Sequence, residues 1–522
     1  MKSIIIAVIL LFAGLNSVFA IEPKANFNVI PIPQIVEVGS SAPFILNGRS
    51  KIYYEEGQEH NASFLQQYIL DITGLTLKLT DKQQKNNVIK LVLEKDISGN
   101  PEKYTLTVNK KEIRITGNSS AGVFYGMQTL RKALPVVQAN KIEIPSGKVE
   151  DSPRFGYRGV HLDVARHFFP ADSIKQYIDI IALHNVNRFH WHLSDDQGWR
   201  IEIKSRPQLT SVGSCRSQTT GDGKPHCGFY TQEEIRDIVN YAKERYITII
   251  PEIDIPGHTA AALASYPELG CTGGPYKVCE VWGGPADVLC AGKQETMRFL
   301  YDVFSEIVDL FPSEYIHIGG DECPKQRWQK CQKCQDKIKE LGIVPDSKHS
   351  AEQKLQSYIM VSIENFLAKK GRKVIGWDEI LEGGLGPNAT VHSWRGMNGA
   401  IEAVNQGHDA ILSPTSHCYF DYDQEKVTPI DKVYALNPIP EGIDAVKLSH
   451  ILGVQANVWT EYIPTFNRVQ FMLLPRLAAL SEVQWSVSER MNYCDFLQRL
   501  KHLSQVYDKY GYNYAKVISV FK

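Results

Sequence analysis

Two acidic residues stand side by side after the stretch YIHIGG, residues 315–320. Neighbouring side chains on a regular strand point to opposite faces, so Asp321 and Glu322 can reach one pocket only if the strand has ended or bends. Gly319 and Gly320 permit that departure, and also a close approach of a ligand to the backbone. A carboxylic acid can protonate the leaving oxygen of a glycosidic bond while another group stabilises the cation-like centre. Glycoside hydrolysis is therefore one chemistry open to this pair.

The adjacency of the two acids limits their roles. An ordinary retaining glycosidase holds its nucleophile and its acid about 5–5.5 Å apart, on either side of the scissile bond. Adjacent residues cannot readily span that arrangement. If Glu322 is the acid, Asp321 is therefore not an ordinary nucleophile and must orient or stabilise something else. The alternative is a turn that carries two solvated acids.

The elements that position this pair repeat as strand, loop and helix after residue 155. Amphipathic stretches such as Thr231–Arg245 and Gln294–Leu310 separate most of the strands. The pattern predicts an α/β fold, a (β/α)8 TIM barrel over residues 151–522. A doubly wound open sheet is the alternative, but no glycine-rich phosphate loop follows the first strand. The eight expected strands are residues 157–165, 188–195, 248–254, 315–322, 373–379, 390–394, 410–414 and 451–459.

Two segments precede the predicted barrel. Residues 21–150 alternate short β-rich runs with helical spacing, which predicts a smaller α+β accessory domain. Residues 1–20 carry one charge, an apolar run and small side chains near the end, which is typical of a cleaved secretory signal. We expect export to a periplasm, a lysosome or the medium, with no membrane span after cleavage. The balance of 57 basic and 58 acidic residues argues weakly against nucleic acid as a partner.

Acids and large aromatic rings recur at the predicted C-terminal strand ends, where barrels of this kind build their active sites. Aromatic faces stack on sugar rings and carboxylates accept hydroxyl hydrogen bonds, whereas phosphate would call for basic residues or a helix N-terminus. The lining therefore predicts a neutral polyhydroxy ligand. Its members are Asp195, Asp196, Asp254, His258, Asp321, Glu322, Trp377, Asp378, Trp394, Tyr419, Asp421, Trp459 and Glu461.

Four motifs together resemble glycoside hydrolase family 20, the β-N-acetylhexosaminidases. They are YRGVHLDVARHFFP (157–170), FHWHLSDDQGWR (189–200), PEIDIPGH (251–258) and HIGGDE (317–322), and they stand in the family's order over nearly the whole barrel. The N-terminal domain also resembles the family's accessory domain. In that family the nucleophile is the substrate's own 2-acetamido oxygen, which gives an oxazolinium intermediate and net retention.

The resemblance implies a role for each part of the motifs. Glu322 is the general acid and later the base, and Asp321 accepts a hydrogen bond from the acetamide N–H, steering its carbonyl toward the anomeric carbon. Arg158 is expected to bind the hydroxyls at C3 and C4 of the sugar. Glu461 is expected to bind those at C4 and C6, which favours release of a single terminal sugar.

The remaining residues are expected to complete the sugar-binding site. Tyr419 resembles the tyrosine that donates to the acetamide oxygen, with Asp421 beside it. His258 and Asp254 resemble a pair that holds and tunes the acid, and Asp195 is expected to fix Arg158 or another residue that contacts substrate. Three tryptophans resemble those that enclose the acetamide and stack under the sugar: Trp377, Trp394 and Trp459. Four further polar residues are expected to be structural: Arg166, His167, His190 and His317.

Three other functions fit parts of the pattern. His190, His192 and His258, with Asp321, could form the open zinc site of a metal-dependent hydrolase, but the aromatic lining has no role there. A member of the same family could release a disaccharide, and a sugar-binding module could lack catalysis. The expected substrate is an oligosaccharide or glycoconjugate that ends in a β-N-acetylhexosaminide, and no cofactor is expected.

Ten cysteines follow residue 20, an even number that does not reveal their connectivity. Cys331 and Cys334 form the sequence CQKC, which is half of a zinc-ribbon pattern, and no second CxxC follows. A local disulfide or free thiols are the simpler interpretation of this pair.

Overall fold

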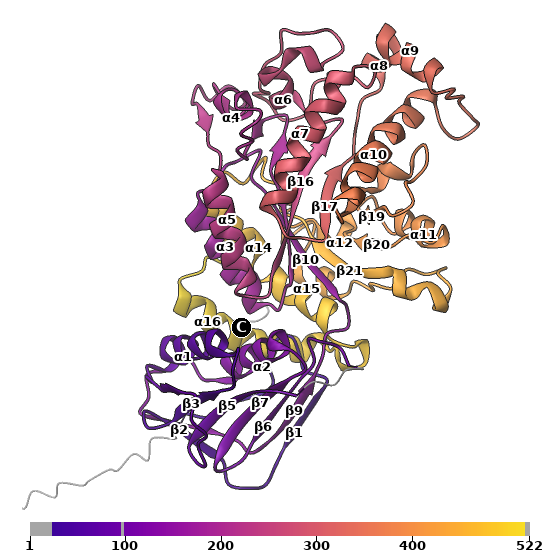
Figure 1. Ribbon diagram of the computed structural model, residues 1–522. Helices are drawn as coiled ribbons and strands as arrows, with labels where there is room; N and C mark the ends of the chain where they lie inside the picture. The colour runs from indigo at the N-terminus through magenta and orange to yellow at the C-terminus, as the bar shows by residue number, and fades with distance from the viewer. Residues whose placement is uncertain (1–22, 95–98, 517–522) are drawn as a thin grey trace, which may run out of the picture.

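The N-terminal part of the chain is a sheet covered by two helices. The computed structural model describes residues 23–94 and 99–516, so the predicted signal lies outside the described residues. Helices α1 (Glu59–Thr73) and α2 (Ser120–Ala133) lie between the sheet and the rest of the molecule (Figure 1). The sheet has the order β1 (Ile35–Val38), β9 (Gly147–Asp151), β6 (Tyr104–Val108), β7 (Glu112–Gly117), β5 (Val88–Leu93), β3 (Lys51–Tyr54) and β4 (Lys78–Thr80), and β2 (Phe44–Asn47) pairs separately with β8 (Lys141–Ile144).

Eight parallel strands form a closed barrel. The first strand pairs with the last, with Arg158 opposite Val454, so the open-sheet alternative is wrong. Most strand residues are buried, as expected where a parallel sheet is covered on both faces. The strands are β10 (Tyr157–Asp163), β11 (Arg188–His192), β16 (Thr248–Ile255), β17 (Tyr315–Gly319), β18 (Lys373–Trp377), β19 (Thr390–Ser393), β20 (Ala410–Leu412) and β21 (Ile451–Ala456), and each falls on an expected strand.

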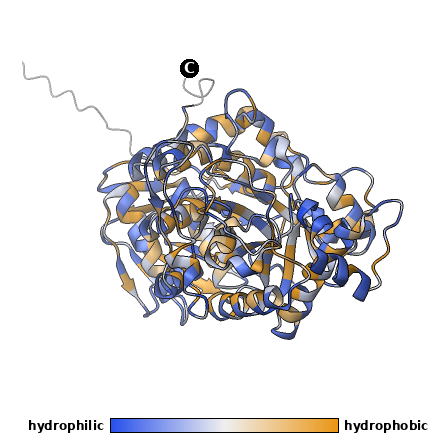
Figure 2. Cartoon of the chain, turned by 90° about the horizontal axis from the view of Figure 1, so that it is seen from above, coloured by the Kyte–Doolittle hydropathy of each residue, from blue (hydrophilic) through white to orange (hydrophobic). Residues whose placement is uncertain are grey.

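Helices surround the barrel, and the view from above shows hydrophobic and hydrophilic residues mixed along them (Figure 2). Helix α5 illustrates why. A capping box between Thr231 and Glu234 starts it, and Ile235, Ile238 and Val239 form its buried stripe. The longer helices are α3 (Ala171–Leu183), α5 (Gln232–Lys243), α7 (Gln294–Leu310), α10 (Ala351–Lys369), α11 (Asn398–Asn405), α14 (Phe466–Leu473), α15 (Arg476–Trp485) and α16 (Tyr493–Tyr510).

Short helices and strands lie in the segments that follow the C-terminal ends of the barrel strands. After β17 the chain makes an outlying excursion that contains α8 (Gln326–Lys330) and α9 (Gln332–Glu340), at the upper right in Figure 1. The others are β12 (Ser194–Asp195), β13 (Gly198–Trp199), α4 (Gln208–Ser211), β14 (Cys215–Arg216), β15 (His226–Cys227), α6 (Ala260–Ser265), α12 (Thr415–Cys418) and α13 (Ile430–Tyr434). A disulfide joins Cys215 to Cys227. Within the described ranges no helix combines the length and apolarity that crossing a membrane requires.

Candidate active site

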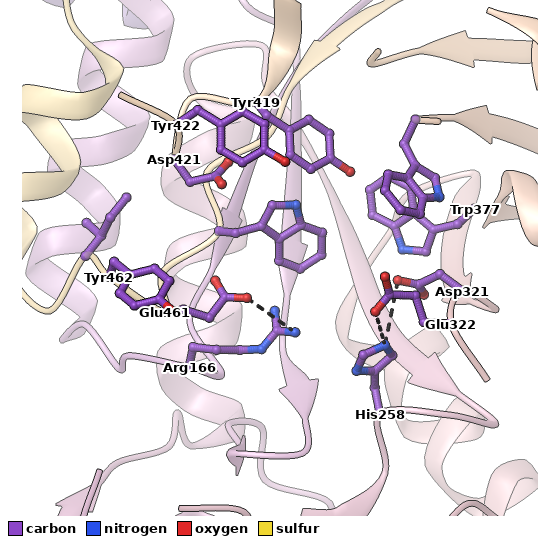
Figure 3. A pocket seen from close by; sticks show the side chains of 13 residues that line it. Arg166, His258, Asp321, Glu322, Trp377, Tyr419, Asp421, Tyr422, Glu461 and Tyr462 are labelled. Atoms are coloured by element: carbon purple, nitrogen blue, oxygen red, sulfur yellow. Dashed lines mark ion pairs between the residues drawn. The ribbon is translucent and has the colours of Figure 1, made fainter. Parts of the chain in front are cut away.

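A pocket of about 370 Å³ opens at the C-terminal ends of the barrel strands, a size within the usual range for small-molecule sites. Figure 3 shows its acids and aromatic rings turned toward a shared space. Most of the sequence-predicted lining is present, and three aromatic or apolar residues join it that the sequence did not single out. The lining residues are Arg166, His258, Asp321, Glu322, Trp377, Trp394, Tyr419, Asp421, Tyr422, Trp459, Glu461, Tyr462 and Ile463.

The backbone after β17 turns both acids to one side of this pocket. Gly319, Gly320 and Glu322 have φ angles of 66°, 102° and 46°, so the chain leaves the extended conformation at once. A Cβ on Gly319 would lie 1.7 Å from Oδ1 of Asp254, and that same oxygen accepts the N–H of Gly320 at 3.2 Å. Only glycine fits there, which explains the Gly-Gly that precedes the acids. The left-handed Glu322 is a strained position of the kind that active sites retain.

One histidine faces both acids. Nε2 of His258 lies 3.9 Å from Oδ2 of Asp321 and 3.8 Å from Oε2 of Glu322 (Figure 3). On its other side, Nδ1 lies 3.2 Å from Asp195. Burial opposes protonation of this ring, but Asp195 and Asp254 outweigh burial and raise the pKa of His258 well above its usual value. The positive charge of this ring therefore faces both acidic side chains.

Arg166 is the arginine of the pocket, which corrects its expected structural role. Its Nη2 lies 2.9 Å from Oδ2 of Asp195 and 3.8 Å from Oε1 of Glu461, and its guanidinium lies 5.0 Å from the ring centre of Trp459. Asp195 is almost fully buried and holds Arg166 and His258 together. Asp195 therefore fixes an arginine that lines the pocket, but that arginine is Arg166.

The prediction that Arg158 binds substrate is wrong. Arg158 is 1% exposed and bonds to Glu102 at 2.7 and 3.0 Å, to the hydroxyl of Tyr125 and to two backbone carbonyls. It is the second residue of β10, whereas the pocket lies beyond the other end of that strand. At about 3.3 Å per residue, the five residues to Asp163 put it about 16 Å from the C-terminal end of β10.

Aromatic rings wall the pocket as the resemblance implied. Trp377 and Trp459 have ring centres 5.8 Å apart at 45°, and Trp394 stacks on Tyr419 at 6.1 Å. The indole N–H of Trp377 donates to Glu252 at 2.8 Å and that of Trp394 to Glu379 at 3.0 Å, so carboxylates fix both rings. Glu379 was not predicted, although it directly follows Trp377 and Asp378 in the motif GWDE.

Several pocket carboxyls hold their protons more tightly than free acids. Burial raises the pKa of Asp321, although the positive charge of His258 opposes the shift. Burial and the neighbouring charge of Asp321 raise the pKa of Asp254 well above its usual value. Burial also raises the pKa of Asp421 to about 7 and, with the charge of Asp321, that of Glu379 to about 8. Such shifts are typical of catalytic clefts.

The histidines below the pocket belong to a buried network of contacts around Glu252. Glu252 lies 2.5 Å from Nδ1 of His192, 3.0 Å from Nε2 of His190 and 2.9 Å from Nδ1 of His317. The other nitrogen of His192 contacts Asp195, and that of His190 contacts Gln455. His190 and His192 thus share Glu252 below the pocket, whereas His258 faces the catalytic acids, so these contacts do not support the predicted metal site of His190, His192 and His258.

The fold and the pocket together define a class of protein: a (β/α)8 glycosidase with adjacent carboxylates at the end of its fourth strand. The model of the glycosyl hydrolase family 20 catalytic domain matches residues 155–488, and that of the family's domain 2 matches residues 26–152. The chain belongs to glycoside hydrolase family 20.

Relatives match nearly the whole length of this chain. A β-hexosaminidase of Porphyromonas gingivalis is 43% identical over 94% of this chain, which spans 65% of that protein's length. The solved structure of a family 20 β-N-acetylhexosaminidase from Streptomyces coelicolor A3(2) matches with a TM-score of 0.83 at 30% identity, covering 94% of this chain and 98% of that one. A Vibrio harveyi exo-β-N-acetylglucosaminidase in complex with N-acetylglucosamine matches with a TM-score of 0.83 at 31% identity, covering 95% and 79%.

Proposed function

We propose that the protein is an exo-acting, retaining β-N-acetylhexosaminidase that removes terminal β-linked N-acetylglucosamine or N-acetylgalactosamine from oligosaccharides and glycoconjugates. The observation that carries the proposal is the placement of Asp321 and Glu322 on one side of the pocket, 3.9 and 3.8 Å from the same imidazole nitrogen. Two adjacent acids on one side do not flank a bond as nucleophile and acid. The acetamido oxygen of the substrate supplies the nucleophile instead.

The reaction follows from the two carboxyls. Asp321 accepts the acetamide N–H and directs the acetamide oxygen to the anomeric carbon. Glu322 gives its proton to the glycosidic oxygen, the C1–O bond breaks toward that oxygen, and an oxazolinium forms. The Glu322 carboxylate then takes a proton from water, and this water attacks the anomeric carbon. The attack opens the oxazolinium ring and restores the β configuration. Tyr419 donates to the acetamide oxygen, and the negative charge of Asp321 stabilises the ring cation.

The other lining residues support a terminal sugar as the ligand. Trp377, Trp394 and Trp459 offer apolar faces to the acetamide and the pyranose ring. Arg166 and Glu461, whose side chains lie 3.8 Å apart, provide a donor and an acceptor for the ring hydroxyls. Since both charges face the pocket, they suit a non-reducing end, and a disaccharide-releasing mode fits less well. The names of the relatives agree, and the N-terminal stretch 1–20 supports export as the route to such glycans.

Glu322→Gln and Asp321→Asn test the assignment with 4-nitrophenyl substrates and a natural disaccharide. The amide at 322 cannot donate a proton as an acid does, so turnover of the disaccharide should fall about 10²–10⁴-fold, with a smaller loss for the nitrophenyl leaving group. The amide at 321 should lower both rates, because it neither orients the N–H nor stabilises the cation. Wild-type protein should leave 4-nitrophenyl β-glucoside uncleaved.

The exposed Glu489 provides a matched control, since Glu489→Gln makes the same chemical change outside the pocket and should keep full activity. Near-wild-type hydrolysis of the disaccharide by Glu322→Gln would contradict the role of the acid. Efficient cleavage of the β-glucoside would contradict participation of the acetamide.

A further inference from the structure

Four cysteine sulfurs lie close together between the loops that follow β16 and β17. The hydrolytic mechanism does not use these residues. Cys271 and Cys290 belong to the loop after β16, and Cys331 and Cys334 belong to the excursion after β17. All four sulfur atoms lie within 4.8 Å of one another. Cys290 lies 3.5 Å from Cys334 and 3.7 Å from Cys331, and Cys271 lies 3.9 Å from Cys334, measured between sulfurs.

These separations are those of a tetrahedron around a metal ion. Zinc–sulfur bonds are about 2.3 Å long, so two sulfurs of a tetrahedral site with four cysteine ligands lie about 3.8 Å apart. The three sulfur–sulfur distances above scatter around this value. We propose that Cys271, Cys290, Cys331 and Cys334 bind one structural zinc ion as thiolates. Binding releases four thiol protons and leaves a site with four sulfur ligands and no open position, which suits structure and not catalysis.

The arrangement does not divide into two pairs, as two disulfides would require. Cys290 is almost equally far from Cys331 and Cys334, and Cys334 also approaches Cys271. Elsewhere in the same chain Cys215 and Cys227 are joined as a disulfide, whereas these four cysteines are free. A single shared ligand accounts for four mutually close sulfurs.

The surroundings of the cluster are built for close packing. Of the four cysteines, Cys290 and Cys334 are fully buried. A Cβ on Gly292 would lie 2.2 Å from the carbonyl carbon and oxygen of Lys333, so glycine lets the loop rest on the CQKC turn.

The excursion needs such a cross-link because its own apolar surface is small. Among the residues of α9 only Cys334 and Ile338 are buried, and in α8 only Trp328. Two other contacts join it to the preceding loop: Trp328 donates to the carbonyl of Leu289 at 2.9 Å, and Arg327 pairs with Asp287 at 2.8 Å. Small segments without a core of their own are commonly held by a metal.

The position of the site gives the ion a role. The two cross-linked segments continue directly from the strand ends that carry His258 and Glu322. A zinc ion therefore ties together the two loops that flank the catalytic acid, without touching the pocket. We expect its loss to loosen the excursion first and to lower activity only as a consequence.

The first test is the metal content of the full chain, purified without a metal-binding tag and measured by plasma mass spectrometry. About one zinc per chain is expected. Replacement of zinc by Co²⁺ in the wild-type protein should give the intense thiolate-to-cobalt absorption of a tetrahedral sulfur site. Absence of metal after incubation with zinc, together with a mass four hydrogens lower from two further disulfides, would overturn the proposal.

Variants locate the ion. Cys331→Ser combined with Cys334→Ser should abolish the cobalt absorption and make the 323–350 segment the first site of proteolysis. Cys494→Ser, an exposed free cysteine on α16, is the matched control and should keep both zinc and protease resistance. If the double variant does not fold, the wild-type zinc and cobalt measurements still decide the question. Zinc retained by a folded double variant would also overturn the proposal.

Discussion

Charged side chains at the barrel mouth contact one another in a continuous series. Arg166 and His258 share Asp195, His258 faces Asp321 and Glu322, and the carboxylates outweigh the cost of burying two cations. The same groups that bind a sugar are therefore linked electrostatically to those that cleave it, so changes at Asp195 should affect both.

Arg166→Lys should lower kcat/KM for a terminal β-N-acetylglucosaminide about 10- to 100-fold. A hydrogen bond to a charged group contributes about 1.5–3 kcal/mol, and lysine cannot reproduce the geometry of guanidinium. Steady-state kinetics measures the loss. Arg158→Lys is the matched control, because Arg158 lies outside the pocket. An unchanged Arg166→Lys enzyme would contradict the placement of the sugar hydroxyls.

Asp195→Asn should change the pH dependence of catalysis. Asp195 raises the pKa of His258, so its removal lets the imidazole lose its proton at a lower pH. The positive charge that faces the two acids is present below that pKa and lost above it. The alkaline limb of kcat/KM should therefore move to lower pH in the variant.

Profiles of kcat/KM against pH for both proteins measure this shift. Asp287→Asn, which changes an acid outside the pocket, should leave the profile in place. A wild-type alkaline limb in Asp195→Asn would show that His258 does not set it.

At the level of secondary structure, the end of β17 depends on backbone conformation more than on side chains. Gly319 lets the strand turn while Asp254 packs against it, and the turn brings two consecutive residues to one side. The strand itself is ordinary, with Ile316 and Ile318 buried on one face and His317 buried on the other. The residues that distinguish this strand from the others of the barrel are therefore those just past its end.

Gly319→Ala should destabilise the protein and lower kcat. Its Cβ would meet Asp254, including the backbone Cα at 2.8 Å, and its φ of 66° disfavours any side chain. Gly371→Ala is the matched control, since Gly371 has a φ of 73° with nothing within 4 Å. The control should lose about 1–2 kcal/mol of unfolding free energy from conformation alone, with kcat unchanged. Denaturant unfolding and kinetics compare the two, and equal effects would exclude the clash.

Over the whole molecule, the accessory domain and the base of the barrel are joined by buried polar contacts. Arg158 at the start of β10 pairs with Glu102, which follows β5 and precedes β6, and Trp485 of α15 donates to Asp151 at 2.8 Å. Tyr510 of α16 also reaches Asp71 of α1 at 3.1 Å. These contacts lie at the end of the barrel opposite the pocket, so the N-terminal domain supports the barrel and does not contribute to the described lining.

Glu102→Gln should destabilise the protein without changing KM. It leaves the buried Arg158 without its charged partner, a change that typically costs about 3–5 kcal/mol. Thermal unfolding and kinetics below the transition measure the two effects. Glu143→Gln, whose partner Lys24 is well exposed, should have little effect on stability. A KM change in Glu102→Gln would place Arg158 in substrate binding after all.

Patterns in the sequence were enough to predict the barrel, its eight strands and the pair Asp321 and Glu322, with an open sheet left as the alternative. Strand periodicity and a strand-end motif are local properties, and the C-terminal ends of parallel strands must meet. The aromatic lining followed for the same reason. The motifs alone also carried the resemblance to the family that the comparisons confirm.

The choice between Arg158 and Arg166, which lie in the same motif, depends on the folded barrel. The direction of β10 puts the first at the base and the second at the mouth, and residue type cannot tell them apart. The same holds for His190 and His192, whose nitrogens are taken by Glu252 and other partners from distant segments. The four-cysteine cluster could not be predicted from the sequence either, because Cys271 and Cys290 show no CxxC spacing. Their partners Cys331 and Cys334 come from the next strand's loop, and folding alone brings the two halves together.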